Sequence, residues 1–369
     1  EVSLERKNGI YTWVIILSIL TFTMSVTGTF LVRSGILNSV HTFANDPSRG
    51  LYILIFLSLM VLSSLYIFYK YTPKEKNDFK FFTKEFFILI NNWFMIFFLI
   101  VVLIGTLFPI ILQVISQQQI SVGPPYYISI LAPFLIPFLF FSSLGPKTNW
   151  SISKGFNKKN IFFIFLFSAT SVIIFFYFTE IKDIMINLIL VSSIYLISQT
   201  SLDLFSAIKK KHIAGYNELS RIVSHLGFGF LIFFISINSI FSVEYDFNVK
   251  VGEEKKIKNF DIVLQKLVIS SKQNYKSIAG NIIIRDREKN TMEYLKPEIR
   301  IYDQPKTITY EASIKSDFLK DSYVTMSNLS GTEFYNIKFQ NKPFMNLIWI
   351  SVIFISLGGL MRIIMRKKI

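Results

Sequence analysis

Histidine is the residue type through which this 369-residue chain could do chemistry, because it has three histidines and no cysteine. The lack of cysteine excludes thiol nucleophiles, iron–sulfur clusters, thiolate zinc sites and disulfide bonds. An imidazole can still transfer protons near neutral pH or bind a haem iron as an axial ligand. The three candidates are His41, His212 and His225.

His225 lies in an apolar segment four residues after Arg221, so a helix places both side chains on one face. A titratable side chain inside a membrane helix is costly and usually faces a partner or a cavity. This pair suits haem, with the imidazole on the iron and the guanidinium on a propionate. Gly227 and Gly229 remove bulk nearby, where a flat ligand or a neighbouring helix could approach. The alternative is a histidine bonded to a neighbouring helix, with the glycines serving helix packing.

His41 lies between two apolar runs and is flanked by Arg33 and Arg49. We expect residues 35–43 to form a short interfacial helix that holds His41 at the membrane surface. The two arginines could pair with carboxylates of a cofactor, of lipid or of protein neighbours. The simpler interpretation is an exposed interfacial histidine. His212 follows three lysines and is interpreted as a solvated residue of a basic linker.

Two further polar residues, Gln199 and Asp203, lie four residues apart within another apolar run. That spacing would let both line a cavity. Hydrogen bonding between helices is the favoured interpretation.

The elements that must position these residues are membrane helices. Hydrophobic residues make up 51% of the chain, charged residues only 17%, and the mean hydropathy is +0.46, which is untypical of a water-soluble enzyme. Spanning a bilayer takes about 20 apolar helical residues. Eight segments are long enough: 11–31, 51–69, 86–112, 127–144, 161–178, 184–208, 219–241 and 344–364. Pro109 predicts a kink or an early end of the third, and Pro133 and Pro137 predict the same for the fourth.

The net charge of +15 orients the chain in the membrane and does not mark a nucleic-acid site. Only +3 of it lies between Val243 and Lys342, with 17 basic and 14 acidic residues. After eight crossings, one side collects 19 basic residues and the short loops of the other side three. The positive-inside rule therefore puts both termini on the cytoplasmic or matrix side. The three histidines then lie in different compartments and cannot share one metal ion.

Residues 243–342 predict a β domain. Alternating hydrophobicity marks strands at 247–251, 261–269, 281–285, 298–302 and 307–312, and turn residues at 278–281 and 303–305 separate them. The expected fold is an all-α polytopic membrane bundle of about eight transmembrane helices, with a small extracytoplasmic all-β domain before the last helix. Its divisions are 1–242, the seven-helix membrane region with the outer loop 33–50; 243–342, the β domain; and 343–369, the last helix and a basic cytoplasmic tail.

A series of motifs along the chain resembles one family. The motifs are TGTFLVRSG at 27–35, SVH at 39–41, DPSRG at 46–50, GTLFP at 105–109, SVGPPY at 121–126, HLG at 225–227, KPEIR at 296–300, KPF at 342–344 and GG at 358–359. They run in family order along essentially the whole sequence. The pattern resembles the carboxy-terminal part of CcmF, the haem lyase component of system I cytochrome c maturation.

The resemblance implies that His41 is one of two outer-side axial ligands of the haem being delivered, and that His225 ligates a separate haem b within the membrane. Arg33 and Arg221 join them as cofactor-binding candidates. The family attaches haem vinyl groups to the two thiols of a Cys-x-x-Cys-His segment of apocytochrome c. His41 would hold the iron during this addition, and the membrane haem would pass electrons from quinol to keep that iron ferrous.

The resemblance also implies partners: an amino-terminal haem-handling half or chain, a haem chaperone, apocytochrome c with its thioredoxin-like and scaffold presenting subunits, and membrane lipid. The family's tryptophan-rich segment and partner histidines are not in this sequence, which begins with Glu1, so we expect a fragment or a naturally split subunit. The expected location is the bacterial or mitochondrial inner membrane, with the β domain on the periplasmic or intermembrane side. A transporter with an intramembrane histidine relay and a non-catalytic assembly scaffold stay open as alternatives.

Overall fold

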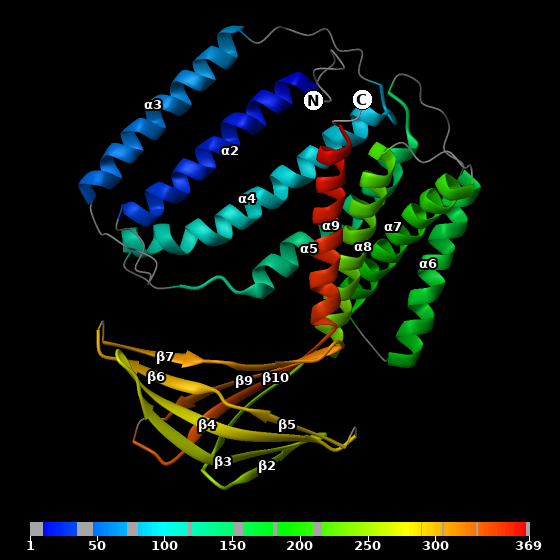
Figure 1. The fold of residues 1–369 in the computed structure, drawn as a ribbon. Coiled ribbons are helices and arrows are strands. Elements are labelled where there is room, and N and C mark those ends of the chain that lie inside the picture. Colours follow the sequence, from blue (N-terminus) through cyan, green and yellow to red (C-terminus); the bar gives the residue numbers. More distant parts are fainter. Residues whose placement is uncertain are drawn as a thin grey trace. The chain divides into compact units, whose positions relative to one another are not determined.

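The computed structural model describes residues 10–34, 47–71, 80–116, 120–150, 158–179, 183–209, 216–288, 290–304, 306–329 and 331–366. Within these ranges the chain forms eight long helices and ten strands (Figure 1). It divides within helix α6 into two compact units, Glu1–Phe167 and Ser168–Ile369. Each unit is described by itself.

Each of the eight long helices is long and apolar enough to cross a membrane, with spans of 19 to 30 residues. The prediction of an integral membrane protein is thereby confirmed in its helical part. The helices are α2 (Ile10–Arg33), α3 (Pro47–Tyr71), α4 (Lys84–Ser116), α5 (Pro124–Leu144), α6 (Lys158–Thr179), α7 (Ile184–Lys209), α8 (Tyr216–Phe241) and α9 (Met345–Arg366), and the short 3₁₀ helix η1 (Gly145–Lys147) follows α5.

The prolines do not end these helices early. Helix α4 continues past Pro109 to Ser116, and α5 runs through Pro133 and Pro137 to Leu144, so the prediction of an early end is wrong. A proline leaves some backbone groups of the helix without a hydrogen bond, and lipid offers no water to bond them. Ending the helix there would leave still more backbone groups without a partner, so the helix continues. Proline does favour the start of α5, where Gly123 is the N-cap and two prolines occupy the first turn.

Two close contacts organise the first unit. A Cβ on Gly50, near the start of α3, would lie 2.7 Å from the Cα of Ser34, just after α2, so the two helices form an antiparallel pair. A Cβ on Gly105 in α4 would lie 2.7 Å from the hydroxyl of Tyr127 in α5. The missing side chains at these two positions therefore let neighbouring segments approach closely.

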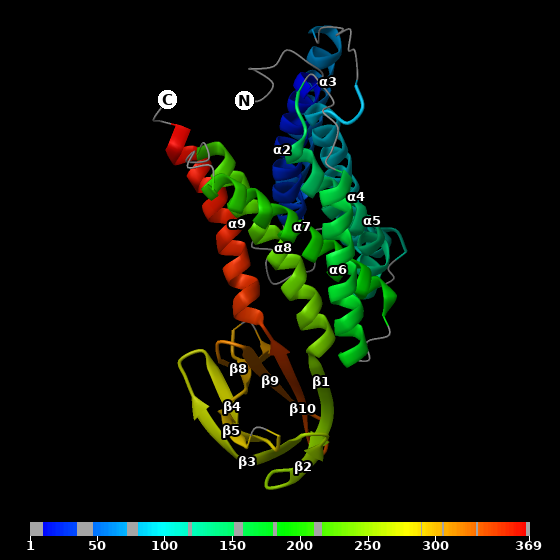
Figure 2. The ribbon, with the colours of Figure 1, turned by 90° about the vertical axis from the view of Figure 1, so that its right-hand side faces the viewer.

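In the second unit, α8 packs between α7 and α9, and Figure 2 shows α8 and α9 leading into the strands β1 and β10. Buried Val172, Leu190 and Ile237 come from α6, α7 and α8 and form one apolar cluster. Phe344, the residue before α9, packs against the same cluster. One end of this helical group therefore has a shared apolar core directly beside the strands.

The strands form an antiparallel β-sandwich between α8 and α9, which confirms the predicted fold class. Their bounds are β1 (Val243–Val249), β2 (Glu254–Ile257), β3 (Phe260–Ser271), β4 (Tyr275–Asp286), β5 (Thr291–Leu295), β6 (Glu298–Tyr302), β7 (Thr307–Glu311), β8 (Ser313–Ser316), β9 (Lys320–Asn328) and β10 (Tyr335–Pro343). One sheet has the order β1-β10-β9-β8. The other has the order β2-β3-β4-β6-β7, with β5 also paired to β4.

The core of the sandwich consists of twelve buried apolar residues contributed by both sheets. One predicted turn lies inside this structure: residues 278–281 are part of the long strand β4, so that prediction is wrong. The glycine there serves packing, because a Cβ on Gly280 would lie 2.6 Å from the sulfur of Met326 in the opposite sheet. The other predicted turn is confirmed at Asp303 and Gln304, between β6 and β7.

Candidate functional site

The first three turns of α8 carry three polar residues on one face: Glu218, Arg221 and His225. Steps of three and four residues bring them into line on a helix. Glu218 lies in the first turn, where a carboxylate interacts favourably with the helix dipole. The rest of the helix is largely apolar, as a membrane span requires.

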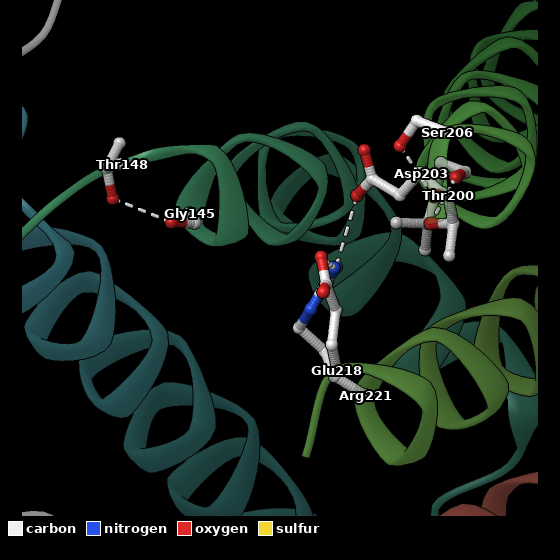
Figure 3. A network of polar contacts seen from close by, with 8 residues as sticks. Gly145, Thr148, Thr200, Asp203, Ser206, Glu218 and Arg221 are labelled. Atoms are coloured by element: carbon white, nitrogen blue, oxygen red, sulfur yellow. Dashed lines mark hydrogen bonds and ion pairs between the residues drawn. The ribbon is translucent and has the colours of Figure 1, made fainter. Parts of the chain in front are cut away.

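Arg221 is held by two carboxylates (Figure 3). Its Nη1 donates to Oδ2 of Asp203 on α7 across 3.2 Å. Its Nη2 lies 3.8 Å from Oε1 of Glu218, one turn earlier on α8. The Arg221 and Asp203 side chains are 25% and 20% exposed, so the pair is largely withdrawn from solvent. This ion pair ties α8 to α7 one turn from the histidine.

The His225 side chain is half-buried, and its imidazole makes no hydrogen bond to any residue that the structure describes. Arg221 and Asp203 are the charged groups that act on it electrostatically. A half-buried imidazole without a protein partner retains a nitrogen for binding a metal. This chemistry fits an axial haem ligand, since such a histidine needs one ring nitrogen directed at the iron.

Neighbouring helices fill the space beside the two glycines that follow His225. A Cβ on Gly227 would lie 2.8 Å from the backbone nitrogen of Ile355 in α9. A Cβ on Gly229 would lie 2.7 Å from Cγ1 of Ile197 in α7. Of the two interpretations open from the sequence, helix packing is therefore the one the structure supports for these glycines.

Helix α8 contacts α9 through another face, about 100° around the helix from the Arg221–His225 face. The Ser220 hydroxyl donates to the backbone oxygen of Gly358 across 2.7 Å, and a Cβ on Gly358 would lie 2.8 Å from the backbone nitrogen of Ser224. The two helices therefore touch backbone to backbone, and α8 has little freedom to rotate. The orientation of its Arg221–His225 face is therefore fixed as well.

The two polar residues of α7 have different partners. Asp203 bonds across to α8, so the favoured interpretation of helix–helix bonding is confirmed for it. The amide of Gln199 donates to the hydroxyl of Tyr195 within the same helix, across 3.1 Å, and both side chains are 1% exposed. The role of Asp203 as the partner of Arg221 could not be read from the sequence, because 18 residues separate them.

The remaining candidates belong to other parts of the chain. Arg33 is the last residue of α2; it is exposed and makes no ion pair to another described residue. Arg49 is exposed in the first turn of α3. His41, the helix expected at 35–43, and His212 lie outside the described residues.

Comparison with known proteins finds similarity to proteins named CcmF. A family model described as the CcmF C-terminal beta-sandwich matches residues 240–343. The cytochrome c-type biogenesis protein CcmF of Haemophilus influenzae is 28% identical over 98% of this chain. CcmF of Escherichia coli is 26% identical over 97% of it. The chain is a homologue of the carboxy-terminal region of CcmF.

The fold of CcmF agrees with this assignment. A solved structure entitled Cytochrome c Heme Lyase CcmF superposes with a TM-score of 0.70 over 95% of this chain, at 14% identity. The chain spans about half the length of its relatives: 58% of the H. influenzae CcmF, 56% of the E. coli CcmF and 54% of the solved CcmF chain. The CcmF family model covers the β-sandwich and its junctions with α8 and α9, whereas the candidate site lies on the helices.

Proposed function

We propose that this chain is the haem-binding, carboxy-terminal portion of a haem lyase that attaches haem covalently to apocytochrome c. The observation that carries the proposal is the imidazole of His225, to which no described residue hydrogen-bonds and which α8 holds one turn from Arg221. Relatives named for cytochrome c biogenesis and the likeness to a solved haem lyase support it.

His225 would ligate the iron of a haem b within the membrane, and Arg221 would bind a propionate of that haem. A guanidinium has five N–H donors, so its bond to Asp203 leaves others available. Asp203 would also keep the guanidinium on the histidine's side of α8. When bound, haem b supplies one-electron transfer.

His41 would hold the iron of a second haem, the substrate, and Arg33 would pair with a propionate of that haem. Arg33 is exposed at the end of α2, eight residues before His41, and so is accessible to an anion. Each thiol of a Cys-x-x-Cys-His segment would add across a vinyl group, forming one S–C and one C–H bond. The thiols belong to the substrate, which agrees with a chain that has no cysteine.

The proposal includes the surroundings of the chain. The residues that complete both haem sites would come from an amino-terminal haem-handling half or chain. A haem chaperone and the subunits that present apocytochrome c would be its other partners. We place 1–242 and 343–369 in a bacterial or mitochondrial inner membrane, with 243–342 on the periplasmic or intermembrane side, because basic residues gather on the opposite side.

The test of this function is maturation of a c-type cytochrome in a host that depends on this protein. His41→Ala is expected to reduce covalent holocytochrome at least tenfold and to leave the membrane haem in place. His212→Ala is the matched control and is expected to mature cytochrome normally. Normal maturation by His41→Ala would contradict a role in holding substrate haem and favour the non-catalytic scaffold.

A further inference from the structure

The turn between β8 and β9, residues Asp317–Leu319, presents two large apolar side chains to solvent. Phe318 is 65% exposed and Leu319 is 56% exposed. The turn is closed by a hydrogen bond from the Asp317 amide to the Lys320 oxygen, 2.8 Å long. A closed turn with two adjacent exposed apolar residues at its tip is unusual on a surface facing only water.

This tip is bonded directly to the beginning of a membrane helix. The amide of Phe344, the residue before α9, donates to the Leu319 oxygen across 2.6 Å. The side-chain amide of Asn346 donates to the Asp317 oxygen across 2.8 Å. Two hydrogen bonds therefore hold the turn at the level where the apolar span Met345–Ile364 begins.

The turn also lies over the lipid-exposed face of that helix. Asn346 shares a helix face with Trp349, Ile350 and Ile353, which are 60%, 37% and 56% exposed. Tryptophan is enriched at the membrane–water interface, which agrees with Trp349 in the first turns of the span. The apolar tip thus continues an apolar face that a bilayer would cover.

We propose that the β8–β9 turn inserts Phe318 and Leu319 into the interfacial layer of the bilayer and so acts as a third attachment of the β-sandwich to the membrane. The other two attachments are the covalent junctions of β1 with α8 and of β10 with α9. The partner is the lipid surface itself. Three points of attachment would hold the tilt of the sandwich more firmly than the two chain connections alone. This inference does not depend on haem.

The lack of cysteine makes a site-specific test simple. Leu319→Cys and, separately, Phe318→Cys are labelled with an environment-sensitive fluorophore in the full-length protein, reconstituted into phosphatidylcholine nanodiscs. The matched control is Val251→Cys, an apolar turn residue of 46% exposure between β1 and β2. It lies at the far end of β1, about 20–25 Å along the strand from the end of α8.

We expect the labels at 318 and 319 to emit at shorter wavelength, to be quenched by nitroxide-labelled lipid and to be protected from iodide. The label at 251 is expected to show the reverse on all three counts. Iodide quenching at 318 and 319 equal to that at 251 would overturn the proposal. Protection from both quenchers would overturn it as well, because protein rather than lipid would then cover the turn.

Discussion

The β-sandwich and helix α7 bury different proportions of polar side chains. In the sandwich, twelve buried apolar residues form the core, and five other buried residues are polar: Asp261, Ser277, Asp286, Glu293 and Ser322. Of the seven buried residues of α7, four have polar side chains: Ser192, Ser193, Gln199 and Thr200. The exposed residues of the same helix include Leu202, Phe205 and Ile208. The sandwich is therefore built around an apolar core, as is typical of a domain surrounded by water. Helix α7 exposes apolar side chains, which suits lipid, and buries polar ones.

This difference explains why the candidate site lies on helices. A polar group inside a membrane bundle must find a partner, because lipid offers none. Asp203 finds Arg221, and Gln199 finds Tyr195. Among the polar groups of the Arg221 face of α8, the His225 imidazole is the one that no described residue bonds. Two predictions apply the same kind of substitution to both regions, and a third concerns the surface of the sandwich alone.

The largest effect on stability is expected from glycine-to-alanine substitution in the helices. In Gly227→Ala the new methyl group would meet the backbone of Ile355, which cannot move aside, and overpacking should cost about 1–3 kcal/mol of unfolding free energy. In Gly280→Ala it would meet the flexible side chain of Met326, and the cost should stay below about 1 kcal/mol. Hydrogen–deuterium exchange of peptides from α8 and β4 measures the two separately. A larger loss of stability in Gly280→Ala than in Gly227→Ala would contradict this difference between the helices and the sandwich.

The next effect is expected at the ion pairs, through acid-to-amide substitution. Asp203→Asn removes the charge that holds Arg221 beside His225, so we expect haem content to fall severalfold while the protein stays folded. Glu244→Gln is the matched change on the sandwich, where Glu244 bonds the exposed Lys338, and it should leave haem content unchanged. The haem content of wild type and of both variants is measured as the pyridine complex. Equal haem in Asp203→Asn and wild type would show that the pair is only structural.

The smallest effect is expected from pH on the sandwich surface. The hydrogen bond from Lys338 holds the pKa of the Glu244 carboxyl below its usual value. Because this pKa is lower in the folded state, the pair stabilises the protein above the usual glutamate pKa, and this contribution is lost as pH falls through the lowered value. Water screens the exposed pair, so the change in stability should be small.

Thermal unfolding of wild type and Glu244→Gln at about pH 6 and about pH 3, either side of the usual glutamate pKa, measures it. The difference between the two proteins should shrink at the lower pH. A stability difference between the two proteins that grows as the pH falls would contradict the predicted direction of the effect.

The helices could be predicted from the sequence because each span is a long apolar run, and their ends differ from the predicted ones by a few residues. Pro109 does not end α4 early, since a lipid environment retains a helix that water would break. Residues 278–281 have turn-like composition, yet Gly280 lies within a strand, where its missing side chain leaves room for Met326 from the other sheet. That contact joins residues far apart in the sequence, so no local sequence pattern predicts it.

Among the strands, those with clear alternation could be predicted, and β2, β5, β8, β9 and β10 were missed. Ile337 and Phe339 alternate with polar residues in β10, so one usable signal was present. The candidate site was predicted in part. The spacing of Arg221 and His225 places them on one face, but nothing local indicates that Asp203 is the partner of Arg221. Which helix faces which depends on packing over the whole bundle.

The central claim is that His225 ligates a haem within the membrane. The most direct measurement is the dithionite-reduced absorption spectrum of the purified protein with its native partners, wild type beside His225→Ala. We predict a b-type spectrum in the wild type and its loss in the variant, with thermal unfolding of the protein unchanged. The same reduced spectrum in both proteins, or no haem in the wild type, would contradict the claim.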